Sequence, residues 1–305
     1  KDLEICEDIG HKHGAATAIG NIGLIHRLRD DFGKAMKYYE KQLKICEQIN
    51  DKAGLARVLG NMGNIYLDWQ EFAKAMECHK RSLTISEEQN DEEGIAASIG
   101  NLGNVYEEEG DYKQALACYQ KLLTMSEAQK DQACVSIAIG NIGIIYANMG
   151  NYEKALENQK RKMAICEKMG NRRGASYAWA NMGDAYLEQK NYSQALECYE
   201  NAIVLSRELE NIYYLCEFLQ HKATILFRQN QIAEAQACND EALQIAAKVG
   251  RQDIIVLATI LLHEIERNAD ALKAMLAIQN LDESQTAMVY HALWRIAQTA
   301  EYRQK

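Results

Sequence analysis

The chain has 305 residues, of which 48% are hydrophobic and 25% are charged, as in ordinary globular proteins. Its 34 basic and 43 acidic residues give a net charge of −9, which argues against nucleic acid as a partner because such a surface needs a basic field. The longest apolar run, residues 254–262, falls far short of the roughly 20 residues that span a bilayer. Proline, which interrupts helices, is absent, and we predict an all-α protein without a membrane or nucleic-acid partner.

The first residues match the end of a helix that occurs again further along the chain. The pattern of Leu3, Ile5, Cys6 and Ile9 returns 40 residues later. We therefore expect residues 1–11 to be the end of a preceding, truncated repeat. Together with the polar end of the chain, this predicts a fragment of a larger protein.

A motif of apolar residue, Gly or Ala, Asn, apolar residue and Gly recurs every 40 residues. It occupies residues 19–23, 59–63, 99–103, 139–143 and 179–183. Apolar residues lie at helical spacing around the motif and again after it, as at residues 95–106 and 112–126. Self-similarity at this period predicts a solenoid of helical hairpins, with six hairpins of about 40 residues in residues 12–250.

Capping residues predict where the helices begin. First helices should start near Asp51, Asp91, Asp131 and Asn171, and second helices where a polar residue precedes an aromatic one, as at residues 111–112. Glycine inside a helix costs about 1 kcal/mol relative to alanine, so we expect Gly23 and its equivalents to let small residues such as Ala35 approach closely. Residues 251–305 lose the register, and we predict divergent helices at 253–268, at 269–279 and from 282.

Two units resemble the tetratricopeptide repeat family. The residues that follow the family's consensus order are Ile99, Leu102, Gly103, Tyr106, Ala115 and Tyr119, and then Trp179, Met182, Gly183, Tyr186, Ala195 and Tyr199. The longer period and the missing closing proline are similar to the repeats of kinesin light chain, spindle-orientation scaffolds and bacterial multidomain signalling proteins. The resemblance implies a right-handed α-solenoid of antiparallel hairpins that binds other proteins.

Asparagine recurs at the third motif position, at Asn21, Asn61, Asn101, Asn141 and Asn181. Asparagine is a poor helix former, so five of them in one register need a reason. The resemblance implies that this face lines the concave groove, where each amide holds a peptide backbone through one donor and one acceptor. The alternative is that each amide bonds to an adjacent repeat and ties the stack together.

The residues expected to bind peptide share this helical face. Besides the five asparagines they are Arg57, Asn64, Asn104, Ile137, Tyr177 and Asp184. The face mixes apolar and acidic side chains, among them Leu24, Asp68, Glu108 and Glu188, which predicts a ligand with apolar anchors and some Lys or Arg. The family's carboxylate-clamp chaperone sites need clustered basic residues here. Only Arg57, with Arg27 nearby, is present, so binding of chaperone tails is disfavoured.

The cysteines and histidines do not form a recognisable chemical site. Cys6, Cys46 and Cys166 share a repeat position that Ser or Ala fills elsewhere, as expected for a small residue between helices. A Cys-x-x-Cys pair is absent and the seven histidines are scattered. We predict no metal, no cofactor and no enzymatic activity. Many free thiols indicate a reducing compartment and hence the cytoplasm.

Two questions stay open from the sequence. A basic cluster, defined as Lys160, Arg161, Lys162, Lys168, Arg172 and Arg173, is either a solvated outer face or a docking patch for an acidic partner. The array itself is a free-standing scaffold, or the regulatory or sensor arm of a larger enzyme, such as a protease or nucleotide-hydrolysing switch with its catalytic residues elsewhere. In the second case the partner is another domain of the same polypeptide. A purely structural array that stacks end to end is a third interpretation.

Overall fold

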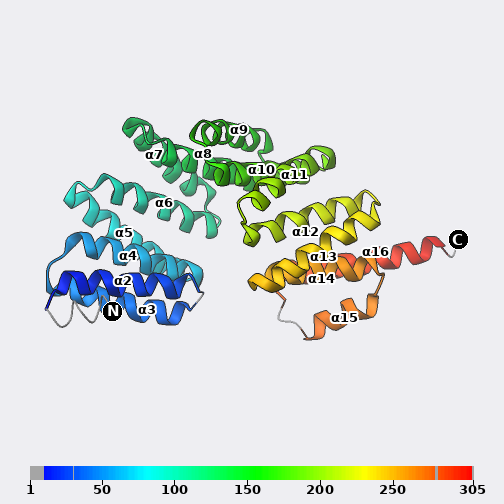
Figure 1. Ribbon diagram of the computed structural model, residues 1–305, viewed down its shortest axis with the longest axis horizontal. Helices are drawn as coiled ribbons and strands as arrows, with labels where there is room; N and C mark the ends of the chain where they lie inside the picture. Colours follow the sequence, from blue (N-terminus) through cyan, green and yellow to red (C-terminus); the bar gives the residue numbers. More distant parts are fainter. Residues whose placement is uncertain (1–9, 30, 279–280, 304–305) are drawn as a thin grey trace. The chain divides into compact units, whose positions relative to one another are not determined.

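The computed structural model describes residues 10–29, 31–278 and 281–303, and every regular element in these ranges is an α-helix (Figure 1). Predictions for residues 1–9, including Cys6 and the preceding repeat, lie outside them. The chain divides into two compact units, one reaching to Asn151 and the other beginning at Tyr152.

The first unit consists of α2 (Lys12–Arg27), α3 (Phe32–Gln48), α4 (Lys52–Asp68), α5 (Phe72–Gln89), α6 (Glu92–Glu108), α7 (Tyr112–Gln129) and α8 (Gln132–Asn148). Each helix packs on the next, so that α2 and α3, α4 and α5, and α6 and α7 form hairpins. The first helices of neighbouring hairpins also touch, α2 with α4 and α4 with α6. The first helices thereby present adjoining faces.

The second unit consists of α9 (Tyr152–Met169), α10 (Arg172–Glu188), α11 (Tyr192–Glu208), α12 (Ile212–Arg228), α13 (Ile232–Val249), α14 (Gln252–Ile265), α15 (Ala269–Ile278) and α16 (Glu283–Arg303). Helices α10 and α11 form one hairpin and α12 and α13 another. Beyond them, α14 packs on both α13 and α12, while α16 packs on α14 and α15. The three divergent helices begin within one residue of the positions predicted from the sequence.

Capping side chains begin most of the helices. The Asp51 carboxylate accepts a hydrogen bond from the Gly54 backbone N–H at 2.9 Å, and Asp111 accepts one from the Gln114 N–H at 3.1 Å. Glu71 begins α5 without such a bond. The turns between helices have one residue in the left-handed conformation every 20 residues, namely Asn50, Gln70, Asn90, Gly110, Lys130, Gly150, Gly170, Lys190, Glu210, Asn230 and Gly250. Equal helix lengths and turns account for the constant 40-residue period.

The last glycine of the motif makes room for a buried ring at Gly23, Gly63, Gly103 and Gly183, and the atoms nearest to these glycines are not those of the alanines that the sequence suggested. A Cβ atom added to Gly23 would lie 2.6 Å from the Tyr39 ring, and one added to Gly103 would lie 2.5 Å from the Tyr119 ring. Ala35 is fully buried, but one turn earlier on the second helix. The loss of helix propensity at the glycines is therefore offset by burial of a large side chain between the two helices.

The small repeat position of the second helices is buried throughout the described part of the chain. Its occupants are Cys46, Ser86, Ser126, Cys166, Ser206 and Ala246, none more than 1% exposed. The interpretation of these cysteines as small packing residues is confirmed. Burial raises the pKa of the Cys46 thiol, and that of Cys198 at a second recurring position to about 12.

The last helices have a core of their own. Ile260 on α14, Leu272 and Met275 on α15, and Val289 and Ala292 on α16 form one buried cluster. Glu264 of α14 is buried at the edge of this cluster and accepts two hydrogen bonds from the Arg295 guanidinium of α16, one of them at 2.8 Å. This ion pair joins α16 to α14.

The fold class predicted from the sequence, an all-α solenoid of antiparallel hairpins, is confirmed. None of the helices within the described ranges is long and apolar enough to cross a bilayer.

Candidate functional site on the first helices

The asparagine face is the set of first-helix side chains that share a face with the recurring asparagine. In the first unit it belongs to α2, α4, α6 and α8, and in the second to α10. Asn21 is exposed and the other four asparagines are half-buried. Leu28 and Ile137 are large apolar side chains exposed to 73% and 53%. The face is at least partly accessible to solvent at each asparagine.

The recurring asparagines do not use their side-chain amides within the fold. Among the described residues, no hydrogen bond to protein atoms involves the side chain of Asn21, Asn61, Asn101, Asn141 or Asn181. A role as ties between repeats would require such bonds to a neighbouring helix. Each amide thus has its donor and its acceptor available at the surface.

An ion pair between α2 and α4 neutralises one acidic residue of the asparagine face. The Arg27 Nε lies 3.2 Å from Asp68 Oδ2, and both side chains are about one-third exposed. Arg57 is exposed and, in the described part of the chain, takes no part in an ion pair. Because Arg27 is already paired, one free arginine remains on α4, too few for a clamp around a carboxylate.

Two predicted site residues are acceptors for buried tyrosines. The Tyr119 hydroxyl donates to Asn104 Oδ1 at 2.7 Å and lies 2.9 Å from Glu107 Oε2, and the Tyr199 hydroxyl donates to the Asp184 carboxylate. Burial raises the pKa of Tyr119 and of the Glu107 carboxyl. Asn104 and Asp184 therefore have a structural role as acceptors for these hydroxyls. Asn104 is half-buried and Asp184 is exposed, so both also reach the surface.

A buried polar residue recurs at one position of the second helices, and sequence reasoning did not recognise it. We call this series the polar column; its members are Tyr39, His79, Tyr119, Gln159, Tyr199 and Asn239, none more than 1% exposed. Tyr39 occupies the Tyr119 position, but the residue 15 positions before it is Leu24. Among the residues that the structure describes, the buried Tyr39 hydroxyl has no hydrogen-bond partner. The 40-residue spacing of these polar residues was the signal that could have identified the column.

Tyr177 lies at the end of an aromatic cluster in the second unit. Its ring meets the Tyr214 ring edge-on at 4.9 Å between centroids, and its hydroxyl is 3.0 Å from Arg173 Nε. Arg172, also of the basic cluster, pairs with Glu208. Burial lowers the pKa of Lys162. The basic cluster is therefore not a uniform patch of free charges.

The described residues contain no group of three or more His, Cys, Asp or Glu side chains placed to hold a metal ion. Helices α4 and α6, which carry several of the predicted peptide-binding residues, are in contact. The structure does not place the residues of α10 relative to those of the first unit.

The family model described as tetratricopeptide repeat matches residues 14–88, 54–128, 92–168 and 131–208, which together cover well over half of the chain. The chain belongs to the tetratricopeptide repeat family. A search of curated proteins returned no match.

Several solved structures share the fold of this tetratricopeptide array. A Signal Transduction ATPase with Numerous Domains (STAND) protein from Pyrococcus horikoshii, which has a tetratricopeptide repeat sensor, is 19% identical with a TM-score of 0.68. The match covers 97% of this chain but only 43% of that protein. BtubC (BKLC) from P. vanneervenii is 16% identical with a TM-score of 0.60, over 73% of this chain and 92% of BtubC.

A Rap protein, solved in complex with Competence and Sporulation Factor, is also similar. It is 16% identical with a TM-score of 0.62, over 84% of this chain and 75% of the Rap protein. At such identities the likeness establishes the fold alone.

Proposed function

We propose that this chain is a protein-interaction module that binds a peptide or helix of a partner protein on the asparagine face. The observation that carries the proposal is the row of solvent-accessible amides that the fold leaves without internal hydrogen bonds. An extended peptide backbone offers one donor and one acceptor per residue, and a side-chain amide matches both at once. A preformed helical surface also loses little conformational entropy when it binds.

The side chains around the amides define the ligand. Leu24, Leu28 and Ile137 are exposed apolar residues that would receive apolar anchors. With Asp68 neutralised by Arg27, the asparagine face of the first unit keeps one acidic residue, the exposed Glu108, and one basic residue, Arg57. We therefore expect a ligand with large apolar residues and an occasional Lys or Arg. A scaffold or signalling role would follow from such binding.

The test is a comparison of two triple variants with the unmodified chain. The first variant combines Asn61→Ala, Asn101→Ala and Asn141→Ala. The control combines Gln48→Ala, Gln89→Ala and Gln120→Ala, which removes three exposed amides from second helices. Thermal melting followed by circular dichroism establishes that all three proteins fold alike.

Each protein is then used to capture partners, which are identified by mass spectrometry and mapped to a peptide. The dissociation constant of this peptide should be about ten-fold higher or more for the asparagine variant than for the unmodified chain, as expected for the loss of several hydrogen bonds worth about 0.5–1.5 kcal/mol each. The control should bind as the unmodified chain does. Equal binding by a folded asparagine variant would refute the proposal, as would a ligand that is uniformly acidic.

A second candidate function is the sensor arm of a larger switch enzyme. It is favoured by the near-complete overlay of this chain on the STAND protein, of which it spans 43%. In that case deletion of the array from the full polypeptide should change the activity of the catalytic part. Unchanged activity would argue against the sensor arm and favour a free-standing scaffold.

A further inference from the structure

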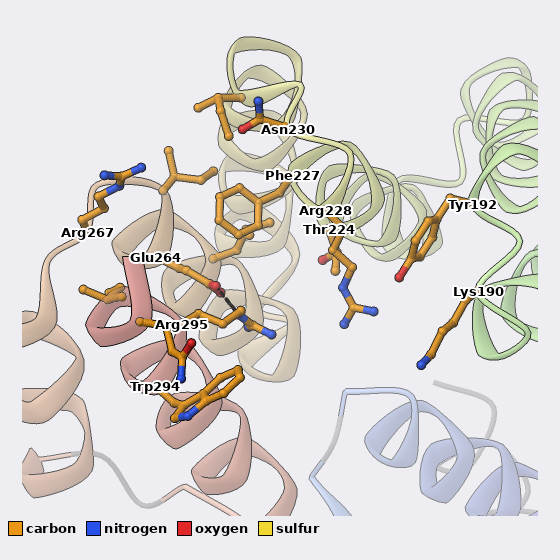
Figure 2. A pocket seen from close by; sticks show the side chains of 15 residues that line it. Lys190, Tyr192, Thr224, Phe227, Arg228, Asn230, Glu264, Arg267, Trp294 and Arg295 are labelled. Carbon is orange, nitrogen blue, oxygen red and sulfur yellow. Dashed lines mark hydrogen bonds and ion pairs between the residues drawn. The ribbon is translucent and has the colours of Figure 1, made fainter. Parts of the chain in front are cut away.

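The second unit contains a cavity outside the repeat pattern, bordered by the divergent helices. The cavity has a volume of about 820 Å³, within the range of roughly 300–1,000 Å³ that ligand sites occupy. Its walls come from the turn between α10 and α11, from α12, from α14 and from α16 (Figure 2). It is formed because α16 packs back on α14 and is held there by the Arg295–Glu264 ion pair.

The cavity is basic, although the chain as a whole is acidic. Lys190, Arg228, Arg267 and Arg295 line it, against the single carboxylate of Glu264. Arg295 neutralises Glu264, and the other three cations are in no ion pair with the residues that the structure describes. Figure 2 shows Lys190 and Arg228 extending toward the same open space from different elements. Three uncompensated cations in one concave site favour an anionic ligand.

The rest of the lining is apolar and aromatic. Phe227, Leu261 and Ile265 contribute apolar surface, and the Trp294 indole is 57% exposed although it borders the cavity. Large exposed aromatic side chains in a concave site are typical anchors for a partner's apolar side chain.

A smaller adjoining cavity extends the site along the same helices. It has a volume of about 340 Å³ and shares Lys190 and Arg228 with the first. Its further walls include the apolar Ile260 and the exposed Met288, and it has two carboxylates, Glu188 and the Glu264 that pairs with Arg295. Lys190 and Arg228 thus border both cavities.

We propose that this C-terminal pocket is a second binding site, which takes an acidic peptide segment whose carboxylates are flanked by large apolar side chains. Lys190 and Arg228 bind the carboxylates, Trp294 contacts one apolar side chain and Met288 the other. The charge preference is opposite to that of the asparagine face, so the two sites select different segments. The proposal does not depend on peptide binding at the asparagine face.

The experiment measures fluorescence polarisation of a synthetic labelled peptide with a central run of Glu and Asp between Leu and Phe. One comparison peptide has Lys in place of the acidic residues, and another has Ser in place of Leu and Phe. The proteins are the full 305-residue chain, its Arg228→Glu variant, and a Lys248→Glu control with the same charge change on an exposed residue outside the pocket. The asparagine triple variant is included to separate the two sites.

We expect the acidic apolar peptide to bind, and its dissociation constant to rise by about ten-fold or more in Arg228→Glu, as for the loss of a hydrogen-bonded charge pair. Lys248→Glu and the asparagine variant should remain close to the unmodified chain. Binding should also change the Trp294 fluorescence, and Trp294→Phe should remove that change. If Arg228→Glu does not fold, Lys190→Glu on the turn before α11 provides the same test.

Three results of the binding measurements would overturn the proposal, and a competition result would do so as well. They are absence of binding by the acidic apolar peptide, equal binding of the Lys or Ser peptide, and unchanged binding by a folded Arg228→Glu protein. Competition by inorganic tripolyphosphate as strong as that by the peptide would also overturn it, because the pocket would then be a simple anion site.

Discussion

Acid should destabilise the first unit through a single buried imidazole. His79 of α5 is fully buried against Gly63, and neither ring nitrogen has a hydrogen-bond partner within the described part of the chain. Burial lowers the pKa of His79 from 6.5 to about 4. Each pKa unit corresponds to about 1.36 kcal/mol, so charging this residue in the folded state costs about 3 kcal/mol relative to the unfolded chain.

The sign of the effect follows from which state binds the proton first. Above pH 6.5 the imidazole is neutral in both states and contributes no pH dependence. As the pH falls from 6.5 toward about 4, the unfolded chain takes up the proton while the folded chain does not, so the free energy of unfolding decreases. Roughly 2.5 kcal/mol should be lost by about pH 4.5.

The assay is urea unfolding followed by circular dichroism at about pH 7.5 and about pH 4.5. His79→Gln should remove the loss, because Gln159 occupies the equivalent position in another repeat and does not titrate. His11→Gln is the matched control at an exposed position. Carboxylates titrate equally in all three proteins and cancel in the comparison. An equal acid dependence in His79→Gln, or an NMR titration of His79 with a pKa near 6.5, would refute the reasoning.

Three further predictions follow from burial and close packing. Gly103→Ala should destabilise the chain by about 1–3 kcal/mol in thermal or urea unfolding, because its Cβ would collide with the Tyr119 ring, whereas Gly100→Ala has ordinary packing space and should be neutral or stabilising. Tyr39→Phe should raise the unfolding free energy by about 1–3 kcal/mol, since it removes a buried hydroxyl that has no partner; a lower value would indicate a partner for that hydroxyl. Cys198, whose pKa burial raises to about 12, should react with Ellman's reagent far more slowly in the native than in the urea-unfolded chain, and a rapid native reaction assigned to it by mass spectrometry would contradict this.

The local features of the fold were predictable because each is encoded within a few residues. A capping residue such as Asp51 and a turn residue such as Asn50 recur at fixed positions of the repeat, so the helix boundaries could be predicted from the sequence. The partner of the motif glycine was predicted incorrectly. Helical spacing shows that Gly103 must approach the second helix, but it does not show whether Ala115 or Tyr119 lies opposite. That choice depends on the angle at which the two helices cross.

The candidate sites differ in how much the sequence could show. Helical periodicity showed which residues share the asparagine face, whereas the position of that face in a groove was implied only by the family resemblance; in the structure Asn61 is half-buried and Ile137 is exposed. The C-terminal pocket could not be foreseen, because Lys190 and Trp294 are far apart in sequence and Trp294 belongs to a helix outside the repeats. Its existence depends on how α16 packs, which local patterns do not determine.

The polar column has a consequence for how such an array can grow by gene duplication. Tyr119 and its acceptor Asn104 are 15 residues apart within one hairpin, as are Tyr199 and Asp184. A duplicated segment that begins before the first helix contains both the tyrosine and the residue that accepts its hydrogen bond. The buried hydroxyl of the new repeat therefore has a hydrogen-bond partner within that repeat. Recombination between the two helices of a hairpin would instead separate the two residues and leave a phenol without a partner, as at Tyr39. Junctions between hairpins are therefore the sites at which this array can be lengthened or shortened at least cost to its stability.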